Sequence, residues 1–512
     1  MQLIRGRHLL QGVSAVGEPR LIRDGALVHE DGAIVAVGPY AELAPRYAGA
    51  EILGSDRHLV LPGLINAHHH GRGLSPVQLG VPDDALESWL LGAYEQVPAD
   101  RYLDTLYCNL RLIESGVTTV IHSHSLFNAA DFDTEMEAMV QAYRGAGLRA
   151  VFALRARNQN FLAYGDDDGF IASLPEVLRP AVRDLVAPGR MSDDDFFATF
   201  DRVFRRYQSD RFRVFLGPLA PQWCSDAILR RIVHAAEEYD TGIHTHLLET
   251  RYQRVYGRRT YGHGLVPHLR DIGFLGPRIS FAHTVWLTSE DIGILAEAGS
   301  HCCHNPGSNL RLRSGVAPVL RMLEAGLNVA LGMDSHGLND DDDMWQEMRL
   351  CHRLHRPPGI EQAVLPAARL FHLATAAGAK AALWEGQIGR LEPGKRADVV
   401  LLDLEAAGFP YTDPRIDPLE LAVTRARREH VSAVLIDGQT VFRDGRHYGP
   451  SGEPLDLQEV GRQLARSVEE RAGALEHVSR RELVRLLRPH LERYYRAWQE
   501  PLTPHYVYNA RE

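Results

Sequence analysis

The sequence predicts an α/β protein in which a (β/α)8 TIM barrel is flanked by a small β domain and followed by a helical C-terminal extension. Three observations support this prediction. Between residues 59 and 385, apolar strand-like runs alternate with helix-length amphipathic stretches about eight times. Short apolar runs separated by turn residues stand on both sides of that region, and a helical pattern closes the chain. We therefore divide the chain into four segments: residues 1–58, 59–385, 386–448 and 449–512.

The composition is that of a globular protein that handles small molecules. The 512 residues are 45% hydrophobic and 24% charged, and the formal net charge of -10 argues against nucleic acid or an anionic membrane as a partner. No run approaches the roughly 18 to 20 apolar residues of a membrane helix, and the first residues show no secretion signal. The five cysteines are too few and too scattered for a disulfide framework. We expect a cytoplasmic protein with a small-molecule substrate.

Both ends of the chain contain hairpin patterns. In GALVHEDGAIVAVGP, two apolar runs flank Asp31-Gly32, which is a strong signal for a tight hairpin turn. After residue 385 the same pattern returns in ADVVLLDL and in VSAVLIDGQTVFRDGR, where the turn is Asp437-Gly438. We expect the strands of residues 1–58 and 386–448 to pair with each other in one β domain beside the barrel.

The predicted barrel strands end in polar residues. The strand-like runs that carry this feature are GVTTVIHSH, LRAVFALRA, FRVFLGPLAP, TGIHTHLLE, RISFAHTVW, GSHCCHNP and LNVALGMDSHG. Active sites of (β/α)8 barrels lie at the C-terminal ends of the strands. The polar residues therefore stand where a catalytic site is expected.

The segment after residue 449 has the pattern of a helical extension. Ser479 and Glu482 form a capping-box pattern, and an apolar face follows with Leu483, Leu487, Leu491, Tyr494 and Trp498. Such a face packs on the body of the protein or on a second subunit. We expect a homo-oligomer, a dimer or larger.

Three consecutive histidines follow the first barrel strand in LPGLINAHHH. Because side chains alternate along a strand, His68 and His70 share one face and His69 lies on the other. Alone, the motif is also compatible with hydrogen-bonded structural histidines. Later strand ends supply groups that would complete a metal site: His244, His246, Glu249, His283 and Asp334. Imidazoles and a carboxylate suit Zn²⁺ or Fe²⁺, and such a metal activates water for hydrolysis.

These segments resemble a known superfamily when they are taken together. The segments LPGLINAHHH, HTHLLE, FAH, SHCCHNPGSNLRL, GMDS and GQIGRLEPGKRADVVLLD are similar to those of the amidohydrolase superfamily. The resemblance is to its branch of cytosine deaminases, adenosine-type deaminases and triazine hydrolases, and it spans about residues 20–445. It implies a distorted (β/α)8 barrel with one divalent metal, Zn in preference to Fe, and a β-sandwich built from both chain ends.

The resemblance also implies a role for each residue of the motifs. The metal ligands would be His68, His70, His246 and Asp334. Glu249 matches the residue that carries the proton to the leaving nitrogen, and His283 matches the histidine that hydrogen-bonds the attacking water or the substrate. Asp334 would also take a proton from that water. His69 and His244 are expected to have structural or supporting roles.

The scarcity of lysine bears on the number of metals. Dinuclear members of this superfamily bridge two metals through a carboxylated lysine on a central barrel strand. This chain contains only Lys380 and Lys395, and neither stands on such a strand. The resemblance therefore implies a mononuclear site.

The residues around the metal site have to distinguish between possible substrates. Where adenosine-type deaminases usually have G-P-H-S-P-Y after the fourth strand, GPLAPQW places Leu219 at the histidine position, which argues against a nucleoside. In DSHGLNDDDD the relatives' serine is replaced by Leu338. The acidic run Asp340 to Asp343 is expected to be a solvated loop at a helix N-terminus; the alternative is that it caps the next helix and favours a cationic substrate. Candidate substrate contacts, each of which could instead be structural, are Trp89, His124, Arg155, Arg157, Gln159, Trp223, His304 and Asn339.

We therefore expect a mononuclear metal-dependent amidohydrolase that releases ammonia or an amine from an amino-substituted nitrogen heterocycle or a cyclic amidine. The alternative enzymatic reaction is hydrolysis of a cyclic amide or of a C–Cl bond in a triazine-type ring. A scaffold protein that has lost catalysis is the third interpretation, and the presence of all four ligand residues argues against it.

Overall fold

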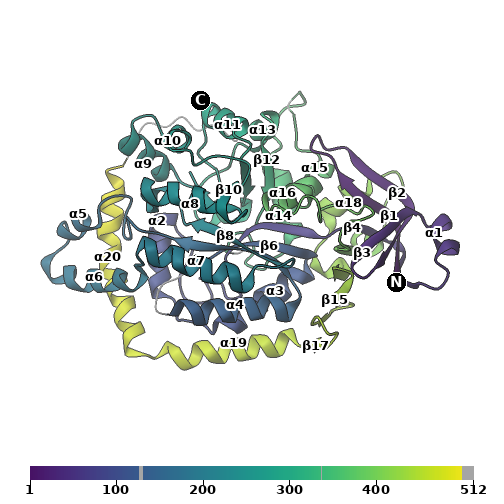
Figure 1. The fold of residues 1–512 in the computed structure, drawn as a ribbon, viewed down its shortest axis with the longest axis horizontal. Helices are drawn as coiled ribbons and strands as arrows, with labels where there is room; N and C mark the ends of the chain where they lie inside the picture. Colours follow the sequence, from purple (N-terminus) through teal and green to yellow (C-terminus); the bar gives the residue numbers. More distant parts are fainter. Residues whose placement is uncertain (126–130, 336, 362, 499–512) are drawn as a thin grey trace.

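Parallel strands surrounded by helices form the centre of the protein (Figure 1). The structure is a computed structural model and describes residues 1–125, 131–335, 337–361 and 363–498. Within these residues, the central sheet has eight strands: β5 (Leu64–His69), β6 (Val117–Ser123), β7 (Arg149–Ala156), β8 (Phe212–Pro218), β9 (Ile243–Leu247), β10 (Ile279–His283), β11 (His301–His304) and β12 (Asn328–Leu331).

The strands of the central sheet follow one another in chain order and close into a barrel. Each strand from β5 to β12 pairs in parallel with the next. The ring is completed by a bridge between His69 and Asp334 and by the backbone N–H of Asp334, which donates to the His68 carbonyl at 2.9 Å. The barrel predicted from the sequence is confirmed. Its closure also places Asp334 beside the first strand.

Helices connect successive strands around the outside of the barrel. The main connecting helices are α3 (Arg101–Glu114), α4 (Phe132–Ala146), α7 (Asp193–Tyr207), α8 (Asp226–Glu238), α9 (Arg251–Tyr261), α10 (Leu265–Asp271), α11 (Ser289–Glu297), α12 (Pro306–Arg311), α13 (Val319–Glu324), α14 (Met344–Leu354), α15 (Ala367–Leu373) and α16 (Ala376–Ala381). Several begin at a side-chain cap; Ser192, Ser225 and Thr288 each accept a backbone N–H of the first turn. Within the described residues, no helix combines the length and the apolarity needed to cross a membrane.

The two ends of the chain build a second sheet, as predicted. Its strands, in spatial order, are β17 (Pro454–Leu455), β16 (Arg446–Tyr448), β15 (Gln439–Arg443), β14 (Val431–Ile436), β13 (Val399–Asp403), β4 (Glu51–Pro62), β1 (Gln2–Val13), β2 (Pro19–Glu30) and β3 (Ala33–Pro39). The expected hairpin turns are present, with Asp31-Gly32 and Asp437-Gly438 both at positive φ. Smaller helices of this region are α1 (Tyr40–Arg46), α17 (Leu404–Gly408) and α18 (Pro418–Arg425).

A buried ionic cluster joins the barrel to the second sheet. The Arg149 side chain on β7 is fully buried, and its Nη2 lies 3.0 Å from Asp398 Oδ1 and 2.7 Å from Asp437 Oδ1. Asp437 also accepts from Arg211 Nε at 2.5 Å. Because these charges are removed from water, each depends on its partners for compensation. The cluster therefore holds the turn after β14 against the end of the barrel at which β7 begins.

We expect Arg149→Met to lower the free energy of unfolding by about 3–5 kcal/mol, because the substitution leaves the buried Asp398 carboxylate without its guanidinium partner. Urea unfolding curves would measure the loss. Arg202→Met is the matched control, since the exposed pair of Arg202 with Asp133 is worth less than about 1 kcal/mol. Equal unfolding midpoints for native protein and Arg149→Met would contradict the expectation.

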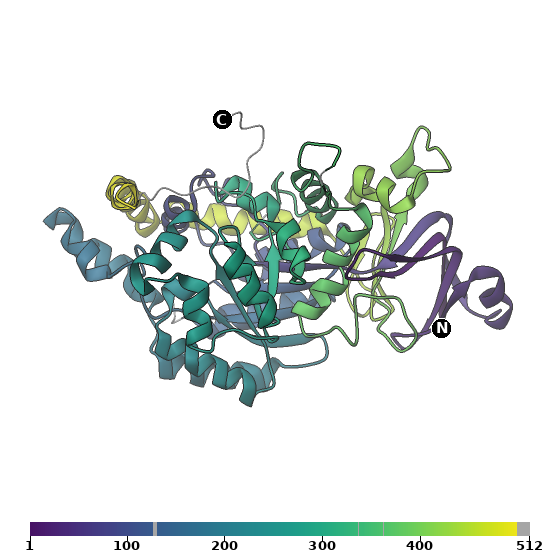
Figure 2. The ribbon, with the colours of Figure 1, turned by 90° about the horizontal axis from the view of Figure 1, so that it is seen from above.

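The C-terminal extension consists of α19 (Leu457–Ala472) and α20 (Leu475–Arg496), which run along the barrel. In both views α20 and the nine-stranded sheet lie at opposite ends of the molecule (Figures 1 and 2). The predicted capping box is not formed, because α20 begins at Leu475 and Ser479 donates to the Leu475 carbonyl inside the helix. Glu482 pairs with Arg485 instead. The buried stripe consists of Val484, Leu487, Leu491 and Tyr495 of the helix and of Trp498 just after it, so Leu483 and Tyr494 lie at its edges.

Candidate metal and catalytic site

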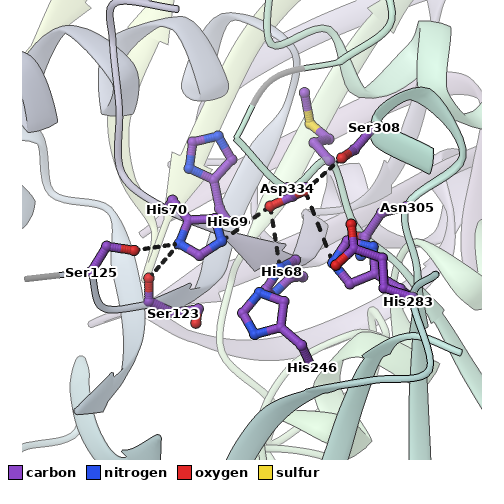
Figure 3. A network of polar contacts seen from close by, with 12 residues as sticks. His68, His69, His70, Ser123, Ser125, His246, His283, Asn305, Ser308 and Asp334 are labelled. Atoms are coloured by element: carbon purple, nitrogen blue, oxygen red, sulfur yellow. Dashed lines mark hydrogen bonds and ion pairs between the residues drawn. The ribbon is translucent and has the colours of Figure 1, made fainter. Parts of the chain in front are cut away.

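Four strand ends bring three imidazoles and one carboxylate together at the mouth of the barrel (Figure 3). His68 lies near the end of β5, His70 follows that strand, His246 lies on β9 and Asp334 follows β12. One ligand atom from each lies within 4.8 Å of all the others. Nε2 of His68 and Nε2 of His70 lie 3.3 and 3.1 Å from Asp334 Oδ1. With metal–ligand bonds of about 2.0–2.2 Å, atoms so close can share one cation.

Backbone carbonyls hold two of these imidazoles in a defined orientation. The Nδ1–H of His70 donates to the Ser123 carbonyl at 2.7 Å, and that of His246 donates to the Leu219 carbonyl at 2.6 Å. Each ring therefore directs Nε2 into the cluster. A backbone partner on the remote nitrogen is the usual way in which proteins orient histidine ligands.

A second histidine orients His68. Nδ1 of His68 lies 2.7 Å from Nε2 of His244, and Nδ1 of His244 lies 2.7 Å from Ser280 Oγ. A His68 ring that keeps a lone pair on Nε2 donates from Nδ1 to His244, which in turn donates to Ser280. The sequence prediction of a supporting role for His244 agrees with this position.

We expect His244→Phe to weaken metal binding by about 10–100-fold, because it removes the hydrogen bond that fixes the His68 ring. Titration against a competing chelator would measure the affinity. His447→Phe, which replaces another buried imidazole on β16 in the second sheet, is the matched control and should bind metal normally. Native affinity in His244→Phe would contradict the supporting role.

Burial sets the charge state of the cluster. It lowers the pKa of His68 and of His246 well below the ordinary value for histidine, so both rings are neutral. Burial alone would raise the pKa of Asp334, but the imidazoles of His68, His70 and His283 that face it outweigh burial and hold its pKa well below the ordinary value. Neutral imidazole and ionised carboxylate are the forms that bind a divalent cation.

The donor set fits one divalent metal. Within the part of the chain that the structure describes, the buried Nε2 atom of His68 has no hydrogen-bond partner, although it faces Asp334. Three nitrogen donors and one carboxylate oxygen make a set that Zn²⁺ and Fe²⁺ accept. The two lysines are remote from it, since Lys380 is exposed on α16 and Lys395 bonds the Glu385 and Gly386 carbonyls.

Two further polar groups face the cluster from β10 and from the end of β9. Nε2 of His283 lies 3.7 Å from Glu249 Oε2 and 3.9 Å from Asp334 Oδ2. The His283 Nδ1–H donates to Asn309 Oδ1 at 2.9 Å, which leaves Nε2 as an acceptor directed at the two carboxyl groups. Burial, together with the charges of Asp334 and Glu87, raises the pKa of Glu249 well above its ordinary value. A protonated Glu249 can donate a proton.

Left-handed backbone geometry occurs at the turns that carry these groups. The φ angles of Leu248, His283 and Asp334 are 47°, 72° and 59°. Such conformations cost about 1–3 kcal/mol at non-glycine residues and concentrate at functional sites. If each strand continued straight, successive side chains would point alternately into and out of the barrel. The turns change this alternation at the positions that carry the catalytic groups.

Three serine and asparagine side chains that the sequence pattern does not indicate support the catalytic groups. Ser308 Oγ donates to Asp334 Oδ2 at 2.5 Å, and Asn309 accepts from His283. Both belong to the SHCCHNPGSNLRL segment, which was recognised as a motif without assigning these positions. Ser314 Oγ donates to Glu249 Oε1 at 3.5 Å. This serine stands outside every strand end, so nothing in the strand pattern indicates it.

A cavity of about 190 Å³ opens at this cluster. Its polar end contains His70, His246, Glu249, His283 and Asp334, and its remaining wall is mainly aromatic and apolar. The wall includes Trp89, Tyr94, Phe161, Tyr164, Leu219 and Trp223. Arg155 and Arg157 also line it, and within the described residues they have hydrogen bonds to backbone carbonyls only. The arrangement suits a planar ring with polar atoms at both ends.

The candidate substrate contacts divide into two groups. Trp89, Arg155, Arg157 and Trp223 line the cavity. The others lie outside its lining: His124 packs between Phe132 and Phe152, Gln159 donates to the Gln222 and Cys224 carbonyls, His304 pairs with His355, and Asn339 is exposed and bonds Gln346.

The acidic run after β12 is more buried than predicted. Asp342 is 3% exposed, and its Oδ1 accepts from Nε2 of His69 at 3.3 Å. Asp343 is 6% exposed and caps α14 through the Trp345 N–H. The expectation of a solvated loop is therefore wrong for these two residues. His69 faces away from the cluster, as its position in the strand predicts, and the acidic run supplies its partner.

Comparison with known families agrees with this geometry. The model of the amidohydrolase family matches residues 59–441, which include every barrel strand and all the clustered residues described above. The chain belongs to the amidohydrolase family.

Curated relatives of this amidohydrolase are deaminases by name. A 5-methylthioadenosine/S-adenosylhomocysteine deaminase of Syntrophomonas wolfei is 33% identical over 450 residues, which are 86% of this chain and 94% of the relative. A 5'-deoxyadenosine deaminase of Methanosarcina mazei is 30% identical over 455 residues, covering 88% of this chain and 94% of the relative.

Solved structures share the fold of this amidohydrolase. An adenosine deaminase from Xanthomonas campestris with bound zinc has a TM-score of 0.76 and 24% identity, covering 92% of this chain and 99% of the other. An atrazine chlorohydrolase from Arthrobacter aurescens complexed with zinc has a TM-score of 0.75 and 23% identity, covering 91% and 100%. The fold predicted from the sequence, a barrel with a sheet from both chain ends, is confirmed.

Proposed function

We propose that this amidohydrolase removes ammonia from an amino-substituted nitrogen heterocycle, and that a purine nucleoside is the first substrate class to test. One observation carries the proposal: His68, His70, His246 and Asp334 converge, and Glu249 lines the same cavity with a carboxyl group whose pKa burial raises well above its ordinary value. A scaffold protein would have no need of this buried arrangement.

The four converging residues would hold one divalent metal. We favour zinc, with iron as the alternative, because three imidazole nitrogens and one carboxylate suit both ions. When bound, the metal lowers the pKa of its water from 15.7 to about 7 and so supplies a nucleophile at neutral pH. Metal analysis of the purified protein distinguishes the two ions.

The remaining groups would move protons. Asp334, held by the Ser308 hydroxyl, takes a proton from the attacking water, and His283 orients that water through its acceptor nitrogen Nε2. Glu249 gives its proton to a ring or leaving nitrogen, because an amine is a poor leaving group until it is protonated. The separation of 3.7 Å between Glu249 and His283 leaves both side chains facing the same reacting carbon.

The relatives named above weaken the sequence argument against a nucleoside. That argument rested on Leu219, which replaces a histidine. In the structure the carbonyl of Leu219 orients His246, and this contact does not depend on the side chain. The Leu219 side chain lines the cavity beside aromatic residues, where it offers an apolar contact to a ring. Trp89, Trp223 and the guanidinium groups of Arg155 and Arg157 are the proposed substrate contacts.

A screen for released ammonia tests the proposal. The metal-loaded enzyme would be incubated with 5'-deoxyadenosine, 5-methylthioadenosine, S-adenosylhomocysteine, free purines, pterins, cyclic amidines and amino- or chloro-triazines. Ammonia from any amino-substituted heterocycle or amidine supports deamination, and ammonia from a purine nucleoside supports the narrower class. Ring opening or chloride release without ammonia would favour the alternative hydrolyses. No turnover of any compound by the metal-loaded enzyme would contradict the proposal.

We further propose that the protein acts in the cytoplasm as a homo-oligomer, a dimer or larger. The dispersed thiols of the sequence support a reducing compartment. Light scattering after size-exclusion chromatography measures the subunit number.

A further inference from the structure

The C-terminal helix α20 lies beyond the region that the family model matches, which ends at residue 441. It nevertheless packs against the barrel mouth, in contact with α2 (Leu86–Gly92), α6 (Arg179–Val186) and the short turn η1 (Ala93–Glu95). Figures 1 and 2 show α20 in yellow across the end of the barrel that is far from the second sheet.

The buried stripe of α20 belongs to the apolar layer above the mouth. Its five residues share one cluster with Leu91, Tyr164 and Trp223, all of which line the cavity. Polar contacts fix the helix in place: Arg488 Nη2 lies 2.9 Å from Glu95 Oε1 and Nη1 lies 3.2 Å from the Ser88 carbonyl. The helix is therefore an integral part of the mouth.

One residue of the stripe reaches the cavity itself. Tyr495 lines it, is 5% exposed, and places its ring 5.4 Å from that of Tyr164 in an edge-on arrangement. The Tyr495 hydroxyl accepts the Tyr164 N–H at 3.0 Å. None of its stripe neighbours on α20 lines the cavity. Among the residues of the extension that the structure describes, Tyr495 is thus the point of contact with the cavity.

The contact partner of Tyr495 belongs to the wall behind Glu249. Tyr164 donates its hydroxyl to Glu87 Oε1 at 3.0 Å, and Glu87 also accepts from Thr250 Oγ1 at 2.5 Å. Gln253, whose amide donates to the Tyr164 hydroxyl, accepts the Glu249 N–H at 2.8 Å. Because these hydrogen bonds are buried, the wall has one preferred arrangement. The Tyr495 ring therefore packs against a rigid surface.

We propose that Tyr495 sets the size limit of the substrate, with α20 as a fixed wall of the cavity; this inference rests on the proposed function for its substrate class. The scissile amine has to lie at His246, Glu249 and Asp334, so the substituent on the ring extends toward the aromatic wall. The cavity, about 190 Å³, is smaller than the roughly 300–1,000 Å³ of sites for drug-sized ligands. A bulky substituent would therefore meet the Tyr495 ring.

The test compares three nucleosides that share one ring and differ in the size of the 5' group: 5'-deoxyadenosine, 5-methylthioadenosine and S-adenosylhomocysteine. Tyr495→Ala is expected to raise kcat/KM for the largest relative to the smallest by about 10-fold or more, since a few carbon atoms in a pocket discriminate by about 10–200-fold. Tyr495→Phe keeps the ring and should keep the native ratio. Leu491→Ala is the matched control, because Leu491 is buried on the same helix and does not line the cavity.

A second readout needs no substrate. Trp89 and Trp223 line the cavity, so acrylamide quenching of tryptophan fluorescence reports access to it once Trp498, which packs against Tyr495, has been replaced by Phe in every variant compared. Quenching should rise in Tyr495→Ala and stay at the native level in Tyr495→Phe and Leu491→Ala. Increased quenching without turnover of any nucleoside by the native enzyme would leave the wall supported and refute the nucleoside class. Native quenching and a native selectivity ratio in folded Tyr495→Ala would overturn the inference.

Discussion

Glu249→Gln should reduce turnover by about 10²–10⁴-fold, the range that a positioned proton donor contributes. The amide keeps the size of the side chain and can still bond Ser314, but it has no proton to give to a leaving nitrogen. Steady-state ammonia release from whichever compound the screen identifies would measure the loss. Because Glu249 is outside the proposed metal ligands, metal content should remain close to one equivalent.

The control for this variant is Glu297→Gln, which changes an exposed glutamate on α11 and should leave turnover unchanged. A Glu249→Gln protein with native turnover would remove Glu249 from the mechanism. A protein that lost both turnover and metal would instead give Glu249 a role in holding the ion.

His246→Ala should lose most of its metal and, with it, its activity. Residues that merely orient a ligand change metal affinity by about 10–100-fold, so removal of a direct ligand is expected to exceed 100-fold. The change also frees the Leu219 carbonyl from its hydrogen bond with the ring. Elemental analysis after dialysis and titration against a chelator would give the stoichiometry and the affinity.

Two further variants test whether His246 is a metal ligand. His246→Cys supplies a thiolate, which zinc accepts, and should recover part of the affinity. His263→Ala removes an exposed imidazole that pairs with Asp271 and should bind metal as the native protein does. Full metal content in His246→Ala would show that the ion is held elsewhere.

The arrangement of the candidate ligands could be predicted because strand order and side-chain alternation both follow from the sequence. Alternation places His68 and His70 on one face, and parallel strands bring all their C-terminal ends to one mouth. The barrel then closes between the first strand and the segment after β12, which puts Asp334 beside His68. Residues hundreds of positions apart meet for this reason alone.

The cavity wall was less predictable, since it depends on how loops and helices pack. His124 follows β6 and Arg155 lies near the end of β7, yet of these two only Arg155 reaches the cavity, while aromatic rings enclose His124. The helical period correctly indicated an apolar face on α20 but placed Tyr494 on it, where the structure buries Tyr495. A rotation of the helix about its axis by one residue decides which side chain enters the cavity. The periodicity of apolar residues does not determine the orientation of the helix to that accuracy.

The burial of the acidic run after β12 is a second feature that the sequence does not predict. A series of aspartates is ordinarily a solvated surface feature, and nothing in DSHGLNDDDD distinguishes one aspartate from the next. The partner that buries Asp342 is His69, which stands more than half the chain away. Pairings of this kind follow from the closed barrel and become visible only once its strands are in place.

The pairing of β4 with β13 constrains the order in which the polypeptide can fold. Strands β1 to β4 leave the ribosome before the barrel does, but β13 begins at residue 399, after the whole barrel has been synthesised. Until then, one edge of β4 exposes backbone groups without a partner, and such edges promote aggregation. Completion of the barrel brings residue 399 back to that edge, so assembly of the enzyme core also protects the nascent N-terminus.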